Sequence, residues 1–186
     1  MKLLFHCCCG PCATACLAPL RAENTEPELL WYNPNIHPYT EYKSRRDSLA
    51  RLGEIENLKL NILDDYGLRA FIREIRNDID NGPQSHDAGR CRICYRLRLE
   101  QTAAHASRQG FDAFSSSLLA SPYQRHELIR KIGEELAEQY RVAFMYRDFR
   151  PHFRDGQAQA RGMGLYMQKY CGCIFSEEER YMGNGA

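Results

Sequence analysis

Short apolar runs alternate with longer amphipathic segments along this chain of 186 residues. Five of the runs have the length and residue types of β-strands, namely LLFHC, ELLWYNP, Leu58–Leu63, FDAFSSSLL and VAFMY. Six helices are expected between and after them, at Cys12–Arg21, Tyr39–Leu52, Gly67–Asp80, Cys91–Gln109, Ser121–Tyr140 and Gln157–Tyr170. The polar segment NGPQSHDAG is expected to form a loop before the fourth helix, and CGC lies in the C-terminal tail.

The helix expected at Ser121–Tyr140 has the clearest pattern, because its apolar residues fall on one stripe. Ser121 is expected to be its N-cap, Pro122 its first helical residue and Gln124 the partner in a capping box. The sequence therefore predicts that this helix begins directly after the strand-like run FDAFSSSLL.

Repeated strand–helix units predict an α/β protein with a Rossmann-like (HUP-like) three-layer fold, in which a mainly parallel sheet carries helices on both faces. The length fits a single domain over residues 1–186. Ligands of such folds bind beyond the carboxyl ends of the strands. The cysteines after the first run, the YNPN segment and the SSSLLASPY segment are all expected at that edge.

The composition is that of an ordinary soluble protein, with 44% hydrophobic and 26% charged residues. No apolar stretch approaches the ~18 residues of a membrane span, so no membrane partner is expected. The N-terminal MKLLFHCCCG lacks the long apolar region of a signal peptide, which favours a cytoplasmic location where thiols stay reduced. The net charge of +1 indicates no general attraction to polyanions.

Nine cysteines in a reducing compartment indicate metal or redox chemistry rather than a disulfide framework. Seven of them form three clusters, and these are Cys8, Cys9 and Cys12, then Cys91 and Cys94, then Cys171 and Cys173. Seven thiols exceed the four that one zinc ion needs, and they suit a four-iron, four-sulfur cluster with a second metal beside it. A structural zinc site remains an alternative. Cys7 and Cys16 are expected in the core.

Polar residues at the same edge could bind a flat, nucleoside-like ligand. The candidates in the loop after the second run are Tyr32, Asn33, Asn35, His37 and Tyr39, and those after the fourth are Tyr123 and Gln124. Asn-Pro pairs also build turns, and Tyr123 could equally belong to the core. His6 is expected to be structural and Asp148 to pair with neighbouring arginines.

Arginines in RCRICYRLR, among them Arg96 and Arg98, could contact phosphates, although arginine-rich helix faces are often merely solvated. Glycine-rich phosphate loops are missing, since the sequence contains neither GxxxxGK[ST] nor GxGxxG. Classical use of ATP or NAD is therefore disfavoured.

The motifs HCCCGPC, YNPNIHPYTEYKSR, RCRICYRLRL, SLLASPYQ and YCGCIFS, in this order, resemble those of the QueH-type epoxyqueuosine reductases over nearly the whole chain. The resemblance implies a cobalamin-independent oxidoreductase that removes the epoxide oxygen of epoxyqueuosine in tRNA to give queuosine. It also implies a four-iron, four-sulfur cluster next to a single metal, iron or else zinc, and an external electron donor.

Carried onto this sequence, the resemblance makes the seven clustered cysteines the metal ligands. We expect Cys9, Cys91, Cys94 and Cys171 to hold the cluster and Cys8, Cys12 and Cys173 the single metal. Releasing an epoxide oxygen as water also requires protons, and Tyr123, Tyr32 and His37 are the candidate catalytic donors. Asn33, Asn35, Tyr39, Gln124, Arg96 and Arg98 are the candidate substrate-binding residues.

Two other functions fit parts of the pattern. An ATP-dependent tRNA-thiolating enzyme of related fold would use the cysteines to carry sulfur, but the missing phosphate loop speaks against it. A zinc-stabilised RNA-binding module would use them for structure alone. Consumption of ATP would identify the first, and a colourless metal-loaded protein the second.

Overall fold

A computed structural model of the chain describes residues 1–80 and 86–183, and its side chains outside residues 77–88. Within these ranges five parallel strands form one sheet in the order β3-β2-β1-β4-β5. The strands are β1 (Leu3–His6), β2 (Pro27–Trp31), β3 (Leu60–Ile62), β4 (Ala113–Ser116) and β5 (Ala143–Phe144). This parallel sheet confirms the α/β class predicted from the alternating pattern.

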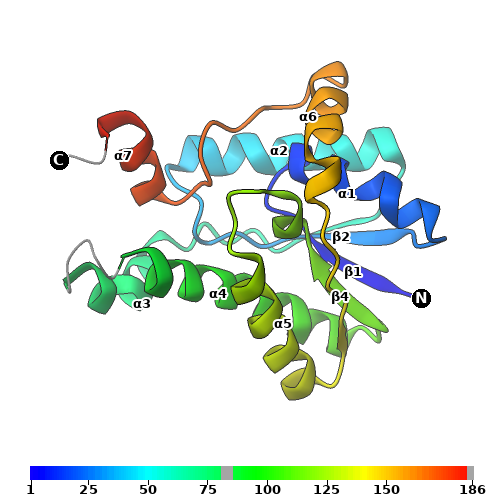
Figure 1. Cartoon of the computed structure of the whole chain (residues 1–186), viewed down its shortest axis with the longest axis horizontal. Coiled ribbons are helices and arrows are strands. Elements are labelled where there is room, and N and C mark those ends of the chain that lie inside the picture. Colours follow the sequence, from blue (N-terminus) through cyan, green and yellow to red (C-terminus); the bar gives the residue numbers. More distant parts are fainter. Residues whose placement is uncertain (81–85, 184–186) are drawn as a thin grey trace.

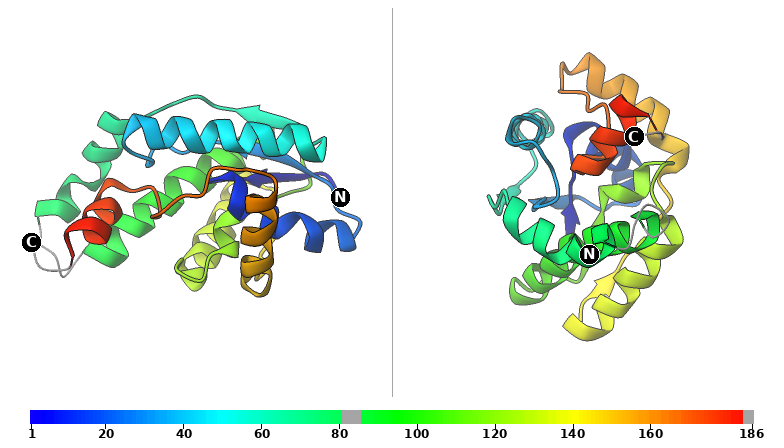
Figure 2. Two further views of the ribbon diagram at one scale, coloured as in Figure 1. Left: turned by 90° about the horizontal axis from the view of Figure 1, so that it is seen from above. Right: turned by 90° about the vertical axis from the view of Figure 1, so that its left-hand side faces the viewer.

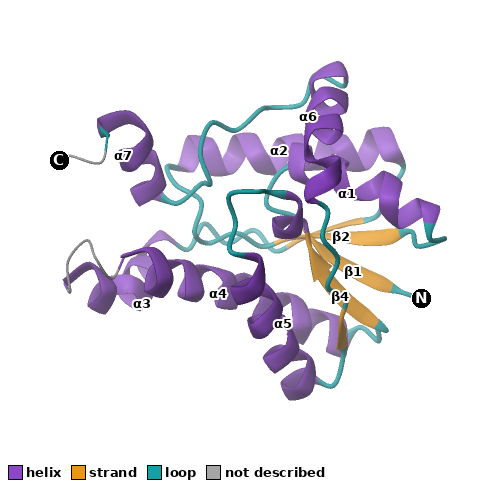
Figure 3. Cartoon of the chain, in the orientation of Figure 1, coloured by secondary structure: helices purple, strands orange, loops and turns teal. Residues whose placement is uncertain are grey.

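Helices cover both faces of the sheet (Figure 3). The α-helices are α1 (Gly10–Ala22), α2 (Tyr39–Glu56), α3 (Leu68–Asp80), α4 (His86–Arg108), α5 (His126–Tyr140), α6 (Phe153–Gly162) and α7 (Ile174–Met182). The helices α1, α2 and α6 lie on one side and α4 and α5 on the other, with α3 packed against α4 (Figure 1). In the described parts of the chain, no helix combines the length and apolar character that crossing a membrane requires.

The central strands β1 and β4 are buried along their whole length, because helices cover them on both faces. Every residue of β1 is buried, and Phe5 packs edge-on against Phe149, which follows β5. The carboxyl ends of β1, β2 and β4 share one edge, since these strands run parallel. Beyond that edge lie α7, α3 and the beginning of α4 (Figure 1), so the three cysteine clusters come from segments that meet there.

The predicted start of the helix after β4 is wrong. A short 3-10 helix, η2 (Ser117–Ala120), follows β4, and α5 begins only at His126. Ser121 forms a turn instead, in which its Oγ accepts a hydrogen bond from the amide of Tyr123 (3.3 Å) and its carbonyl from that of Gln124 (3.3 Å). A Ser-Pro pair initiates turns as readily as helices, and in this protein it forms a turn.

The last helix was also predicted in the wrong place. Helix α6 ends at Gly162 rather than continuing to Tyr170, and Gly164 adopts a φ of +67°, which a helix does not accommodate. The chain then runs in extended form past the carboxyl edge of the sheet to α7, an element that the sequence pattern missed (Figure 2). This run carries Cys171 and Cys173, so it is part of the site.

Two further expectations concern the segment before the fourth predicted helix and the domain count. In the structure α4 begins at His86, so residues 86–89 of the expected loop are helical, while residues 81–85 lie outside the described part of the chain. The expectation of a single domain over residues 1–186 stays a prediction.

Candidate metal centre and substrate cavity

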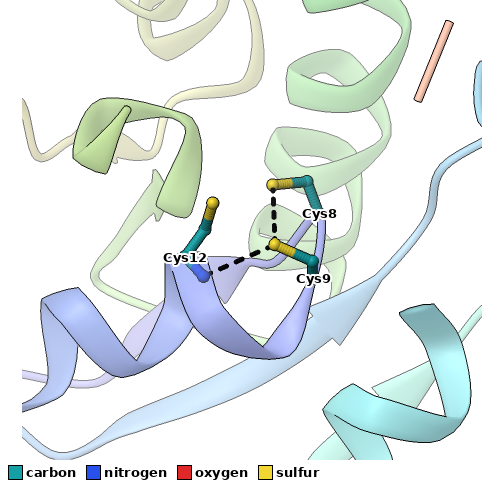
Figure 4. Close-up of side chains that lie close together, drawn as sticks. All are labelled: Cys8, Cys9 and Cys12. Carbon is teal, nitrogen blue, oxygen red and sulfur yellow. Dashed lines mark hydrogen bonds between the residues drawn. The ribbon is translucent and has the colours of Figure 1, made fainter. Parts of the chain in front are cut away.

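The N-terminal thiol group, Cys8, Cys9 and Cys12, lies where β1 ends and α1 begins (Figure 4). Its three sulfur atoms lie within 4.8 Å of one another, and those of Cys8 and Cys9 are 3.8 Å apart. Cys9 is the N-cap of α1, since its sulfur accepts a hydrogen bond from the amide of Cys12 (3.4 Å). The Gly10-Pro11 pair begins the helix as the sequence indicated, two residues earlier than predicted.

This geometry fits one metal ion. A tetrahedral ion with metal–sulfur bonds of about 2.3 Å separates its sulfur ligands by about 3.8 Å. The Cys8–Cys9 distance of 3.8 Å has this value. The thiol group also lies at the N-terminus of α1, where the helix dipole favours thiolates.

Neighbouring groups favour the thiolate form of Cys8. Hydrogen bonds from the thiols of Cys12 and Cys9 hold its pKa well below the usual value, and Ser117 adds to the effect. The Oγ of Ser117 accepts a hydrogen bond from the amide of Cys8 (3.1 Å) and lies 3.5 Å from its sulfur. Cys8 is therefore the thiol of this group that is most ready to bind a metal.

The remaining N-terminal cysteines belong to the core, as predicted. Cys7 and Cys16 are fully buried, and burial raises the pKa of both thiols well above the usual value. Their sulfurs donate to backbone carbonyls, that of Cys7 to Phe5 (3.4 Å) and that of Cys16 to Cys12 (3.3 Å). All nine cysteines of the chain are free thiols.

A second thiol group comes from the start of α4 and from the loop before α7. Its members are Cys91, Cys94, Cys171 and Cys173. Cys94 and Cys173 pack with Phe71 and Ile75 of α3 in a small apolar cluster. The pKa of Cys94 is raised to about 12, mainly by burial. The charges of Cys171 and Cys91 also raise it, because these two thiols lie near Cys94. We call Cys171–Cys173 the CGC loop.

Four cysteines are the number of protein ligands that an iron–sulfur cluster needs. The ligands of a four-iron cluster bind at four corners of a cube and lie further apart than the ligands of one ion, and four cysteines are the usual set. Burial also raises the pKa of Cys173, to about 11, so Cys94 and Cys173 keep their protons until a metal replaces them. The grouping differs from the expected division, because Cys9 lies with Cys8 and Cys12, and Cys173 with Cys94.

Both thiol groups face one cavity of about 610 Å³. Cys8 and Cys12 line it from one side, and Cys91 and Cys171 from the other. Its polar lining includes Ser117, Gln124 and Gln168, and its aromatic lining includes Tyr95, Tyr123 and Tyr170. A cavity of this size with a few convergent polar groups is typical of a small-molecule site.

Two of the predicted polar residues line this cavity. Tyr123 is 85% exposed at its rim, with its ring edge-on to Phe153 at 6.4 Å. The side-chain oxygen of Gln124 accepts a hydrogen bond from the hydroxyl of Tyr95 (2.7 Å). Tyr123 does not belong to the core, so the alternative interpretation of this residue is wrong.

The residues that directly follow β2 instead support the thiol-bearing turn. Asn33 is fully buried, its Nδ2 donates to the carbonyl of Cys7 (2.9 Å), and its Oδ1 lies 3.2 Å from Nε2 of His6. His6 also contacts the Oγ of Ser116 (2.8 Å) and the carbonyl oxygen of Tyr32 (3.2 Å), and burial lowers its pKa to about 4. His6 is thus structural, as predicted. Neither Asn33 nor Tyr32 lines the cavity.

Further along this loop, His37 is buried between the rings of Tyr66 (5.1 Å) and Phe71 (5.6 Å), away from the cavity lining. Its backbone amide donates to the carbonyl of Gly172 (2.8 Å), so the loop holds the CGC loop in place. Tyr39 is 52% exposed and stacks on Tyr42, outside the cavity. Asn35 is buried, and its side-chain oxygen has no hydrogen-bond partner in the described residues.

The two predicted phosphate-binding arginines have different surroundings. Arg96 is 38% exposed and pairs with Glu135 (3.1 Å). Arg98 is 3% exposed and donates to the carbonyl (3.0 Å) and the sulfur (3.0 Å) of Cys94. Arg98 therefore faces the candidate metal ligand Cys94 rather than solvent. Asp148 pairs with Arg150, as expected.

Sequence patterns missed several residues of the site. Arg45 is 1% exposed, pairs with Glu41 (2.6 Å) and donates to two carbonyls at the CGC loop. The Nε2 of Gln168 donates to the sulfur of Cys12 (3.4 Å). The i,i+4 spacing of Glu41 and Arg45 is a visible signal, but nothing in the sequence shows that this pair is buried.

Comparisons with known proteins agree with the resemblance noted from the motifs. The family model described as Epoxyqueuosine reductase QueH matches residues 3–179. The chain belongs to the QueH family. Relatives named Epoxyqueuosine reductase QueH, an oxidoreductase name, include one from Dehalococcoides mccartyi that is 36% identical over 97% of this chain and 94% of its own. A second, from Thermotoga maritima, is 33% identical over 96% and 91% of the two chains.

A further QueH relative, from Streptococcus pyogenes, is 30% identical over 94% of this chain and 70% of its own. Among solved structures, a predicted subunit of a tRNA methyltransferase from Methanocaldococcus jannaschii superposes with a TM-score of 0.57. It covers 87% of this chain and 75% of its own at 12% identity, which supports the α/β fold alone.

Proposed function

We propose that this QueH-family chain is an epoxyqueuosine reductase acting on tRNA, and that it works without cobalamin. The reaction breaks the two C–O bonds of the epoxide, takes up two electrons and two protons, and releases the oxygen as water, leaving a cyclopentene ring. The observation that carries the proposal is that two separate thiol groups face one cavity.

We assign a different metal to each thiol group. Cys91, Cys94, Cys171 and Cys173 would hold a four-iron, four-sulfur cluster, and Cys8, Cys9 and Cys12 a single metal, iron or zinc. The spacing within the N-terminal group supports this division. When bound, the single metal would polarise the epoxide C–O bond and the cluster would pass on electrons from an external donor.

The chain's own residues bind and orient the substrate. A cavity of about 610 Å³ has room for a nucleoside base extruded from tRNA. Gln124 and Gln168 offer amide groups to the edge of such a base, and Tyr123 offers a ring at the rim on which a neighbouring nucleotide can stack. We retain Tyr123 as a candidate proton donor, because Tyr32 and His37 do not line the cavity.

Anaerobic reconstitution with iron and sulfide, followed by assay on tRNA containing epoxyqueuosine with a strong reductant and no cobalamin, tests the proposal. We expect a brown protein with broad absorption near ~400 nm that converts the tRNA base to queuosine. Cys94→Ala should lose both colour and activity, whereas the core variant Cys16→Ala should keep both. A fully loaded wild-type protein that leaves the base unchanged would contradict the proposal, and a colourless zinc protein would favour the RNA-binding module.

A cytoplasmic location and the absence of a membrane partner complete the proposal. In a second series of assays, purified candidate donor proteins would replace the chemical reductant. Turnover with a protein donor at a rate equal to that with the chemical reductant would identify it.

A further inference from the structure

The guanidinium of Arg98 lies inside the protein beside the second thiol group. The residue is 3% exposed, although arginine is among the side chains least often buried. From α4, its Nε donates to the carbonyl of Cys94 (3.0 Å) and its Nη2 to the sulfur of the same residue (3.0 Å). A short N–H···S contact of this kind is directed at a metal ligand rather than at solvent.

Arg98 has no carboxylate partner among the side chains that the structure describes. The other two buried arginines of the site do have one, since Arg45 pairs with Glu41 (2.6 Å) and Arg90 with Glu179 (2.8 Å). A buried cation without a counter-charge costs several kcal/mol. Some other negative group must therefore balance Arg98 in the working protein.

Thiolates are the negative groups within reach. The charge of Arg98 acts on Cys94 first, and also on Cys8 of the N-terminal thiol group and on Cys171 of the CGC loop. The guanidinium thus contacts the second thiol group directly, and its charge also acts on Cys8 of the N-terminal group. Loading the site with metals converts neutral thiols to thiolates, and the loaded centre carries a net negative charge when seven thiolates bind four cluster irons and one divalent ion.

We propose that Arg98 is the positive counter-charge of the metal centre and that it raises the reduction potential of the cluster held by Cys94. An added electron makes the centre more negative, and a fixed cation with a hydrogen bond to a ligand sulfur stabilises that state. Arg98 is then a positioning and electrostatic residue, which does not touch the substrate. The proposal rests on the proposed function for the identity of the cluster.

This role replaces the one expected from the sequence. A phosphate of tRNA approaches from solvent, and Arg98 presents almost no surface to it. Arg96, two residues earlier, is 38% exposed and pairs with Glu135 of α5. The four arginines of RCRICYRLR therefore lie in at least two different environments.

The test compares three variants by redox titration of the reconstituted protein, without tRNA. Arg98→Gln removes the charge, Arg98→Lys keeps a charge but loses the planar guanidinium, and Arg108→Gln removes a charge from the exposed end of the same helix. We expect Arg98→Gln to retain iron and sulfide while its midpoint potential shifts to a more negative value. Arg98→Lys should recover most of that shift, and Arg108→Gln should titrate like the wild type.

A wild-type potential in a fully loaded Arg98→Gln protein would overturn the proposal. If Arg98→Gln does not retain the cluster, Arg98→Lys decides. A loaded Arg98→Lys protein with a near-wild-type potential supports the electrostatic role, whereas loss of the cluster or of the folded circular-dichroism spectrum in both variants would make Arg98 a structural residue. A wild-type cluster in a protein inactive on tRNA would contradict the proposed function and leave this inference standing.

Discussion

Arg45 on α2 donates hydrogen bonds from its Nη1 to the carbonyl oxygen of Cys171 (3.1 Å) and from its Nη2 to that of Tyr170 (2.8 Å). The side chain is 1% exposed and is held by Glu41 one turn earlier on the helix. One buried ion pair thus fixes the loop that carries two of the proposed cluster ligands, although 126 residues separate Arg45 from Cys171.

Replacing Arg45 is expected to loosen the CGC loop. Removing one partner of a buried ion pair costs about 3–5 kcal/mol, because the other charge is left without compensation. Arg45→Met should therefore lower the melting temperature and release sulfide from the reconstituted protein faster than wild type does. Arg51→Met, at an exposed position of the same helix, is the control. Equal sulfide retention in the two variants would show that Arg45 does not hold the loop.

Gly172 separates the two cysteines of the CGC loop with a φ of +107°, which other residues rarely adopt. A Cβ there would lie 3.0 Å from both Nη1 of Arg45 and Cγ1 of Ile36. Gly172→Ala should thus destabilise the loop by at least about 1 kcal/mol and reduce cluster occupancy. Gly164→Ala is the matched control, since Gly164 also has a positive φ (+67°) but nothing within 4 Å of the added Cβ. Similar iron and sulfide contents in the two variants would refute the steric argument.

Two exposed cations, Lys169 and Arg180, lie on the rim of the cavity. If tRNA is the substrate, these side chains are placed to contact its phosphates. Lys169→Gln and Arg180→Gln should each weaken tRNA binding and reduce the slope of log K against log salt by about 1. Lys131→Gln, at an exposed site on α5 outside the cavity, should bind like wild type. Unchanged slopes in both rim variants would place the tRNA on another surface.

Burial lowers the pKa of His37 to about 4, so the folded protein holds this imidazole neutral. The unfolded chain binds a proton near pH 6.5 and therefore takes up more protons between pH 6.5 and 4. The contribution of His37 to the free energy of unfolding is therefore fully present above pH 6.5. As the pH falls towards 4, this contribution decreases by up to about 3 kcal/mol.

The variant His37→Phe isolates this contribution, because it keeps a ring beside Tyr66 and Phe71 and removes the titrating group. The difference in unfolding free energy between wild type and variant, measured by denaturant titration of the metal-free proteins, should change in this pH range and stay constant above it. A difference that is independent of pH from 4 to 7 would mean that His37 does not titrate as described.

The sheet and the cysteine clusters could be predicted because their signals are local. Apolar runs such as LLFHC mark strands that are buried on both faces, and parallel strands bring their carboxyl ends to one edge. The motif spacing then identified Cys8, Cys91 and Cys171 as parts of one site, and the structure places all three on one cavity.

The remaining features of the site depend on long-range packing. The division of the thiols depends on where the CGC loop lies, and this loop is fixed by Arg45 and by the backbone of His37. The burial of Arg98 depends on the packing of α4 against the rest of the fold, which the helical pattern does not specify. Asn33 and His37 are polar residues beside the site, yet their hydrogen bonds support the surrounding backbone.

The most direct test of the two-metal centre is the acid-labile sulfide content of anaerobically reconstituted Cys9→Ala and Cys94→Ala proteins. If the N-terminal thiol group holds a single metal and the second group a cluster, Cys9→Ala keeps the sulfide content of the wild type and loses iron alone, while Cys94→Ala loses its sulfide. Loss of sulfide to the same extent in both variants, or in neither, would contradict this account.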